Sequence, residues 1–235
     1  MPHKIANLDY TLIPYGDNAL LVQFDLPADV KFFSQAINQR VHGLARALRG
    51  TGNWLDVVPG YDSLLCHFNL ARLTAAQAKK GIETHLASPD LAHSESGKII
   101  DIPVAYGGES GPDMQAIMTT SGLSVKAIIE LHSANLYDVC MMGFVPGFAF
   151  LSQAPEELHH PRHETPRQHV PAGSVGIAGW QTGIYGLQSP GGWQIIGRTP
   201  VKLFDKTRKA PFMIEAGDKI RFKPISQKTF DELSS

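Results

Sequence analysis

Cysteine is scarce in this chain of 235 residues, and a long apolar run is missing. The two cysteines, Cys66 and Cys140, each lie between apolar neighbours, which is typical of buried thiols and excludes a disulfide framework. The longest apolar stretch, residues 139–151, is too short to cross a bilayer and contains Pro146. The first twenty residues lack a basic segment followed by an apolar one, so we expect no secretory signal and a cytoplasmic protein.

An excess of charge of either sign is also missing. The chain has 21 Lys and Arg against 22 Asp and Glu, a formal net charge of −1, so no bulk field attracts nucleic acid or an anionic membrane. Hydrophobic residues make up 43% of the sequence, and the 22 glycines and 16 prolines are scattered without a period. This composition excludes collagen, a coiled coil and a wholly disordered chain, and it predicts one large globular domain or two modest ones.

The first ninety residues predict two strands followed by a helix, twice over. In order, we expect strands at 10–14 and 19–25, a helix from Asp29 to Leu48, strands at 54–58 and 63–68, and a helix at 74–86 that Thr74 caps. This order is typical of an antiparallel or mixed sheet with helices on one face. The polar stretch after residue 86 is typical of a linker, so we place an N-terminal α+β domain at 1–95 and a second domain at 96–235.

The second domain is predicted to be mainly β. Residues 143–200 hold ten glycines and seven prolines in short segments, which suit the tight corners of a small β-barrel. The patterns predict strands at 98–105, 201–204, 212–214 and 219–222 and helices at 113–119 and 124–135, the last capped by Ser124. The fold class is therefore α+β.

An aromatic loop stands out at residues 143–151. Phe144 and Phe148 flank Pro146 together with two glycines, which makes a stiff apolar loop of defined shape. Two interpretations stay open, a core-packing corner and the wall of a ligand pocket, because glycine permits close backbone approach in both.

A second stiff segment follows at residues 161–171, where prolines recur every five residues. It presents Arg162 and Arg167, whose guanidinium groups suit carboxylate or phosphate, although two solvated arginines on a surface loop would have the same spacing. Four histidines lie near it, but no acidic or cysteine partner stands at ligand spacing, so we expect no metal site.

The remaining polar candidates are less specific. His132 is placed on the polar side of its predicted helix, as a proton carrier or as a helix-terminal histidine. Ser174 and Gln181, in a glycine-rich stretch, are donors for a cleft or for the backbone of irregular turns. The sequence has no phosphate-binding loop and no nucleophile elbow, and Cys140 has no activating polar neighbour in sequence.

Taken together, several motifs resemble the family of the 5-oxoprolinase B subunit, which also holds the sporulation-kinase inhibitor and was long labelled allophanate hydrolase subunit 1. The resemblance runs from about residue 99 to residue 224. It departs from the usual pattern at Gly186, where proline is common, and at Phe150, where tyrosine is common. The matching segments are 106–113, 130–137, 143–151, 161–167, 170–176, 181–183 and 189–199.

The resemblance implies a cyclophilin-like β-barrel preceded by a small α/β sandwich domain. It also implies a component of an ATP-dependent 5-oxoprolinase, inactive alone, that works with a sister cyclophilin-like subunit and a third subunit. ATP, with magnesium, is then expected in the assembled complex, with no cofactor bound by this chain alone. Related domains occur in the carboxyltransferase part of biotin-dependent urea carboxylases.

On this hypothesis the chain supplies half of a shared cleft for a lactam or amide. The candidate catalytic residues are Glu109, His132 and Arg167, and the candidate substrate-binding residues are Phe144, Phe148, Arg162, Ser174, Gln181 and Arg198. Two alternatives stay open: a non-catalytic regulator that binds a sensor histidine kinase through the apolar cleft of the barrel, and a carboxyltransferase-like subunit acting on a urea-type amide.

Overall fold

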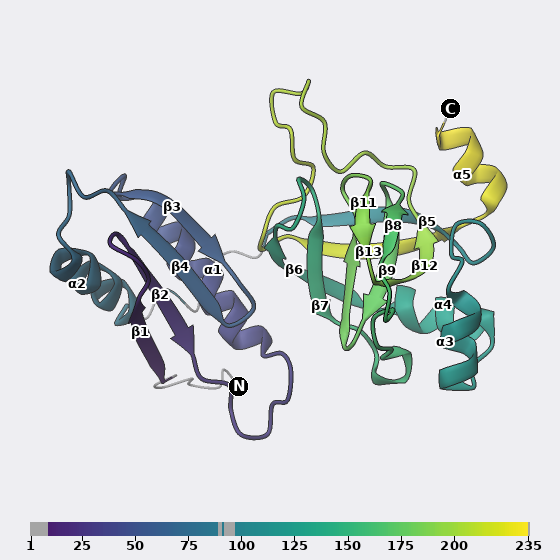
Figure 1. Ribbon diagram of the computed structural model, residues 1–235, viewed down its shortest axis with the longest axis horizontal. Helices are drawn as coiled ribbons and strands as arrows, with labels where there is room; N and C mark the ends of the chain where they lie inside the picture. Colours follow the sequence, from purple (N-terminus) through teal and green to yellow (C-terminus); the bar gives the residue numbers. More distant parts are fainter. Residues whose placement is uncertain (1–8, 89–90, 92–96, 235) are drawn as a thin grey trace. The chain divides into compact units, whose positions relative to one another are not determined.

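The computed structural model describes residues 9–88, 91 and 97–234 of the chain (Figure 1). The chain divides into two compact units, Met1–Glu95 and Ser96–Ser235. Each unit has its own set of buried apolar side chains, as expected of two separately packed cores. No helix in the described part of the chain is long and apolar enough to span a bilayer.

The first unit is a four-stranded antiparallel sheet with two helices. In chain order its elements are β1 (Tyr10–Pro14), β2 (Ala19–Phe24), α1 (Gln35–Arg49), β3 (Trp54–Pro59), β4 (Ser63–Phe68) and α2 (Ala75–Leu86), and the strands lie in the order β1-β2-β4-β3. Alternate residues of β2, Leu20, Val22 and Phe24, are buried in one cluster with the apolar faces of the helices. The predicted strands of this unit are confirmed within one residue at each end.

The start of α1 differs from its prediction. The helix begins at Gln35 instead of near Asp29, because the Ser34 side chain accepts a hydrogen bond from the Ile37 N–H and caps the helix there. The predicted cap of α2 is confirmed. Thr74 and Gln77 form a reciprocal capping box, in which each side chain bonds the other residue's backbone N–H.

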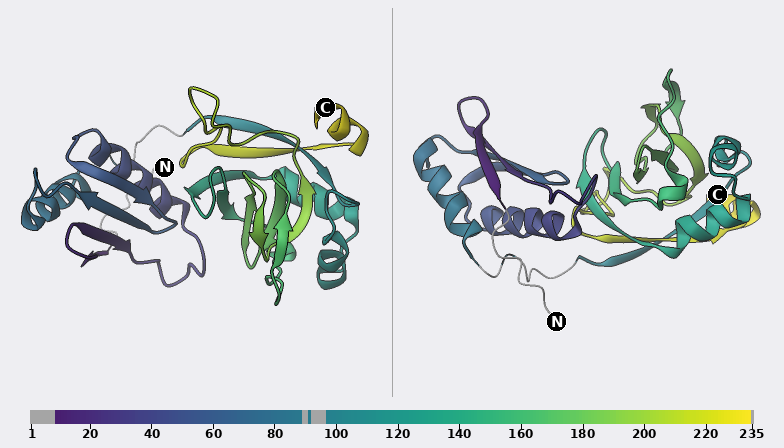
Figure 2. Two further views of the ribbon diagram at one scale, coloured as in Figure 1. Left: turned by 45° about the horizontal axis from the view of Figure 1, so that its top comes forward. Right: turned by 90° about the horizontal axis from the view of Figure 1, so that it is seen from below.

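The second unit is built on a closed barrel. Among the described residues its seven strands run in the order β10-β7-β6-β13-β5-β12-β9, and β9 pairs with β10 to close it. Figure 2 shows the ribbon of this unit from two further directions. Among these strands only β13 and β5 pair in parallel. The strands are β5 (Ile99–Tyr106), β6 (Leu136–Met142), β7 (Ala149–Gln153), β9 (Ser174–Ala178), β10 (Gln181–Ile184), β12 (Gln194–Arg198) and β13 (Lys219–Ile225).

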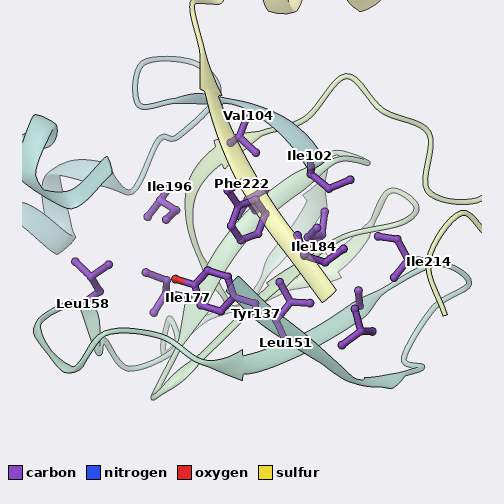
Figure 3. Close-up of a cluster of buried hydrophobic side chains, with 14 of the residues drawn as sticks. Ile102, Val104, Tyr137, Leu151, Leu158, Ile177, Ile184, Ile196, Ile214 and Phe222 are labelled. Atoms are coloured by element: carbon purple, nitrogen blue, oxygen red, sulfur yellow. The ribbon is translucent and has the colours of Figure 1, made fainter. Parts of the chain in front are cut away.

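Branched aliphatic and aromatic side chains fill the barrel. Ile102, Val104, Ile177, Tyr137 and Phe222 belong to its buried cluster (Figure 3). Because large side chains occupy the interior, it is a packed core, and we look for ligand sites outside it.

Short elements surround the barrel. They are α3 (Met114–Ser121), α4 (Val125–Ala134), the 3₁₀ turn η2 (Glu156–Leu158), α5 (Gln227–Ser234) and a two-stranded sheet of β8 (Arg167–Val170) and β11 (Ser189–Gly191). The Ser124 cap of α4 is confirmed. The strands predicted at 201–204 and 212–214 are wrong, since the segment holds a single isolated bridge between Phe204 and Phe212.

Candidate functional site

A hollow on the second unit is walled mainly by aromatic rings, and we call it the aromatic pocket. Its volume is about 370 Å³, within the range of small-molecule sites. Three separate stretches of sequence contribute most of it, which are the loop before β7, the proline-spaced segment before β8 and the turn between β11 and β12. Its lining residues are Phe144, Phe148, Phe150, Arg162, His163, Pro166, Tyr185, Pro190, Gly191, Gly192 and Trp193.

Phe148 is the centre of this aromatic group. Its ring is buried, with its centroid 4.5 Å from that of Phe150, 4.8 Å from that of Tyr185 and 5.4 Å from that of Trp193. Gly183 permits the close packing, because a Cβ there would lie 3.1 Å from the Trp193 ring and 2.9 Å from a backbone oxygen. The inner wall of the pocket is therefore tightly packed.

Phe144 forms the outer edge of the pocket. Its φ of 67° is unusual for a bulky side chain, and the Val145 N–H donates to the Gly143 carbonyl across it at 2.8 Å, which makes a strained γ-turn. The turn leaves the Phe144 ring 64% exposed, 5.6 Å from the Phe148 ring. The interpretation of this loop as a core-packing corner applies to Phe148, whose ring is buried. The interpretation as a pocket wall applies to both Phe144 and Phe148, because both line the aromatic pocket.

Arg162 is a cation that can meet a ligand in the aromatic pocket. Its guanidinium carbon lies 5.8 Å from the centre of the Trp193 ring, a cation–π arrangement. The structure gives it neither a carboxylate partner nor a hydrogen-bond acceptor among the described residues. A ligand carboxylate at this edge of the pocket would meet an unpaired guanidinium.

Arg167, by contrast, is already engaged. Its Nη1 donates to Asp113 Oδ2 at 2.8 Å and its Nη2 donates to Asp113 Oδ1 at 2.5 Å. The same Asp113 carboxylate accepts the Ile195 N–H at 2.6 Å, so the pair ties β8 to β12. This geometry gives Arg167 a structural role and leaves it less able to bind a substrate anion.

His163 completes this cluster on the wall of the aromatic pocket. Its Nε2 lies 2.7 Å from Arg167 Nη1 and 3.3 Å from Asp113 Oδ2. Burial alone would raise the pKa of Asp113, but hydrogen bonds from Arg167 and from the Ile195 N–H outweigh it and hold that pKa below its ordinary value. The imidazole therefore lies beside an ionised carboxylate and also lines the pocket.

His132 lies in the barrel core and does not line the aromatic pocket. Thr182 donates its hydroxyl proton to the Gly176 carbonyl, so His132 Nε2–H donates to Thr182 Oγ1 at 2.9 Å and Nδ1 accepts from Tyr106 at 2.8 Å. Burial lowers the pKa of His132 to about 3, which keeps the ring neutral. This position does not support the predicted proton-transfer role of His132.

Tyr185 is buried at the inner wall of the aromatic pocket. Burial raises its pKa to about 12, and the nearby charges of Arg162 and Arg167 oppose the shift, so the phenol stays protonated. The Trp193 backbone faces the hydroxyl, while no described group accepts its proton. Tyr185 therefore keeps its phenolic proton.

The other candidates lie apart from the aromatic pocket. Glu109 is exposed on the loop after β5, Ser174 is buried at the start of β9, and Gln181 is half-buried at the start of β10. Arg198 lines a different pocket. Of the predicted set, Phe144, Phe148 and Arg162 line the aromatic pocket, and Arg167 contacts the pocket-lining His163.

Two chemistries find little support in the described residues. Cys140 is buried, its thiol donates weakly to the Asp138 carbonyl, and burial raises its pKa well above the ordinary value, so it is not an activated nucleophile. No group of three or more metal-ligating side chains occurs in the part of the chain that the structure describes.

The partners that organise the site are not evident from the sequence. The sequence places Asp113 at the end of a loop and the start of a helix, yet its side chain makes no helix-capping bond and turns to Arg167 instead. It presents His163 only as a possible metal ligand. Two sequence features could have indicated these partners. Asp113 follows the turn residues Gly111 and Pro112, and His163 lies four residues before Arg167.

An α+β unit followed by a closed barrel with an outer aromatic pocket defines a two-unit barrel protein with a candidate ligand site. The model of the family described as carboxyltransferase domain, subdomain C and D, matches residues 10–214. The chain belongs to this family, and its resemblance to the 5-oxoprolinase B subunit is confirmed by curated relatives.

Two of those relatives cover nearly the whole chain. The 5-oxoprolinase B subunit of Escherichia coli O157:H7 is 39% identical over 209 residues, which are 89% of this chain and 93% of the relative. The 5-oxoprolinase B subunit of Bacillus subtilis strain 168 is 33% identical over 237 residues, covering 94% of this chain and 95% of the relative.

Solved structures agree with the fold. TTHA0988 is 34% identical with a TM-score of 0.76 over 88% of this chain, and the match spans only 40% of the TTHA0988 chain. A conserved uncharacterized protein of Pyrococcus horikoshii, PH0987, is 42% identical with a TM-score of 0.56, covering 94% of this chain and all of that one. The Kluyveromyces lactis urea amidolyase, 17% identical with a TM-score of 0.67 over 98% of this chain and 16% of its own, shows the shared fold alone.

Proposed function

We propose that this chain is a component of an ATP-dependent 5-oxoprolinase complex and supplies part of its substrate cleft. The reaction converts 5-oxoproline, ATP and water to glutamate, ADP and phosphate. The observation that supports it is the aromatic pocket, which sets an unpaired Arg162 beside a tightly packed apolar wall. 5-Oxoproline is a small ring with one carboxylate, and this combination of surfaces suits both parts.

We assign roles to the chain's own residues as follows. Arg162 binds the substrate carboxylate, and the rings of Phe148 and Trp193 hold the lactam ring and exclude water. Tyr185, kept protonated by burial, donates a hydrogen bond to the lactam oxygen. Arg167 positions His163 and is held by Asp113.

The chemistry needs an activation of the lactam, an opening of the ring and a hydrolysis of the resulting acyl phosphate. The lactam oxygen attacks the γ-phosphorus of ATP and ADP leaves. A first water then attacks the activated carbon, and the ring C–N bond breaks with a proton moving to nitrogen, which leaves an acyl phosphate. A second water hydrolyses the acyl phosphate to the glutamate carboxylate and phosphate. His163 lines the pocket beside the Asp113 carboxylate, and we assign the proton transfer to its imidazole, in place of His132.

Partners complete this proposal. We infer a sister barrel subunit and a third subunit in the active complex, with ATP and its magnesium held mainly by those subunits, and with this chain inactive alone. The subunit names of the curated relatives support assembly with other subunits. A cytoplasmic location remains a prediction of the sequence.

The test is an omission experiment. The purified chain, its two candidate partner subunits, 5-oxoproline and ATP are mixed, and glutamate is measured with each protein left out in turn. We expect glutamate only from the complete mixture. Glutamate from the partners without this chain, or no glutamate from any mixture, would contradict the proposal.

One observation favours a second function, a regulator that docks on another protein. The Phe144 ring stands 64% exposed at the edge of the pocket, on a strained turn that holds it outward. In the omission experiment this function predicts no glutamate, together with tight binding of a sensor kinase that Phe144→Ala weakens.

A further inference from the structure

A second hollow lies next to the aromatic pocket on the same unit, and we call it the basic pocket. Its volume is about 650 Å³. The neighbouring residues Tyr185 and Gly186 line one pocket each, so a single backbone segment separates the two hollows. Its lining residues are Ala172, Gly173, Gly186, Leu187, Arg198, Thr199, Pro200, Val201, Lys202, Phe204, Asp205, Lys206, Thr207, Phe230 and Ser234.

Positive charge is concentrated on one side of this pocket. The segment 202–209 carries four cations and one acid in a chain whose net charge is −1. Asp205, the acid, already has partners, since its carboxylate accepts the Thr207 hydroxyl at 2.6 Å and lies 3.5 Å from Arg208. No described carboxylate forms an ion pair with the pocket-lining Lys202 or Lys206.

Arg198 lines the same pocket with its orientation already fixed. Its Nε donates to the Ala172 carbonyl at 3.0 Å, and its guanidinium carbon lies 5.7 Å from the centre of the Phe230 ring. Its two terminal nitrogens have no acceptor among the described residues. A guanidinium fork held in this way loses little side-chain entropy when an anion binds.

Beside Arg198, the wall of the basic pocket consists of two backbone segments that pack closely together, one at Gly173 and one at Thr199. Gly173 has a φ of +83°, and a Cβ there would lie 2.2 Å from the Thr199 carbonyl oxygen. The Thr199 N–H donates to the Gly173 carbonyl at 2.9 Å, so a hydrogen bond joins the two backbone segments. The pocket is therefore formed by closely packed segments as well as by long side chains.

We propose that the basic pocket binds the phosphoryl group of a small molecule, with Arg198 as its main anchor. Arg198 supplies paired N–H donors, and Lys202 and Lys206 supply point charges from the neighbouring loop. A phosphate with nearly two negative charges and several acceptor oxygens matches three cations, whereas a single carboxylate would leave two of them uncompensated. The inference depends on the chain's own geometry and does not require the proposed catalytic function.

Binding to the isolated chain of 235 residues tests this directly. Inorganic phosphate, pyrophosphate and ADP are titrated by calorimetry into the wild type, Arg198→Gln and the double variant Lys202→Gln/Lys206→Gln. The control is Lys79→Gln/Lys126→Gln, which removes the same charge from exposed lysines that pair with Glu83 and Glu130 on helices outside the pocket.

We expect saturable binding to the wild type, weakened about tenfold or more in both pocket variants and unchanged in the control. Tighter binding of ADP than of pyrophosphate would identify a nucleotide as the source of the phosphoryl group, and equal binding would identify a free phosphate or simple ester. If Arg198→Gln does not fold, the proposal is tested by comparing Lys202→Gln/Lys206→Gln with the wild type and the control.

Two results would contradict the proposal that the basic pocket binds a phosphoryl group. Absence of saturable binding of all three ligands to the wild type would overturn the proposal. So would binding that falls as much in the control as in the pocket variants, because the interaction would then reflect overall charge and not this pocket.

Discussion

Arg167 and Asp113 stand 54 residues apart in the sequence and form a two-point ion pair beside the aromatic pocket. The Asp113 side chain is 7% exposed and also holds the Ile195 N–H. The pair joins β8, the start of α3 and β12, and it fixes His163 in place. Three segments of the second unit thus depend on one buried carboxylate.

Removing the arginine from this pair should destabilise the protein. Arg167→Gln leaves the Asp113 carboxylate buried without its main partner, and because Arg167 is 34% exposed we expect a loss of roughly 1–3 kcal/mol in the free energy of unfolding. Urea denaturation measures this. Asp113→Asn/Arg167→Gln should recover part of the loss, and single variants as stable as the wild type would show that the pair does not stabilise the fold.

Acid should weaken the same pair. The folded-state pKa of Asp113 lies below its ordinary value, so its stabilising effect is complete above the unfolded pKa of about 3.9 and is lost as the pH falls through the folded pKa. We expect the free energy of unfolding of the wild type to fall more steeply below about pH 4 than that of Asp113→Asn. Parallel curves for the two proteins in that range would contradict the assignment.

His132 should not titrate in the range usual for histidine. Its folded pKa of about 3 lies below the unfolded value of about 6.5, so unfolding takes up a proton, and stability should fall with decreasing pH between these values by up to about 1.4 kcal/mol per unit. Imidazole NMR shifts of His132 should stay flat from about pH 8 to about pH 4.5. A midpoint near the ordinary histidine value would show that solvent reaches the barrel core.

Trp193 should report on the aromatic pocket. Because its ring lies on the pocket wall, a ligand there changes its surroundings, whereas Trp54 lies in the first unit. We expect 5-oxoproline to change the intrinsic fluorescence of the assembled complex, with the change lost in Trp193→Phe and kept in Trp54→Phe. A response that survives Trp193→Phe would place the ligand elsewhere.

Much of the fold follows from local signals in the sequence. The β1 and β4 strands have the predicted bounds, and the caps at Thr74 and Ser124 are visible because side-chain capping depends on neighbours a few residues away. The later loops are harder to predict. The run around Phe204 has strand-like composition, yet it folds as a loop with a single bridge, since no neighbouring strand pairs along its length.

The site is only partly visible in the sequence for a different reason. Glu130 and Ser133 suggest a polar side of the helix for His132, but this residue lies four after the buried Ile128 and so shares the core-facing side. The pairing of Arg167 with Asp113 is a contact between distant segments, and no periodicity signals it. Phe144 and Arg162 can be identified as candidates from the sequence, because the prolines that stiffen their loops lie within a few residues of them.

The most direct test of the account is the Michaelis constant for 5-oxoproline in the reconstituted complex with Arg162→Gln. The control is Arg221→Gln, an exposed arginine paired with Asp101 on the barrel strands. The account predicts that Arg162→Gln raises KM about tenfold or more through loss of the carboxylate contact, while Arg221→Gln leaves it unchanged. An unaltered KM in a folded, assembled Arg162→Gln complex would contradict the claim that the aromatic pocket holds the substrate.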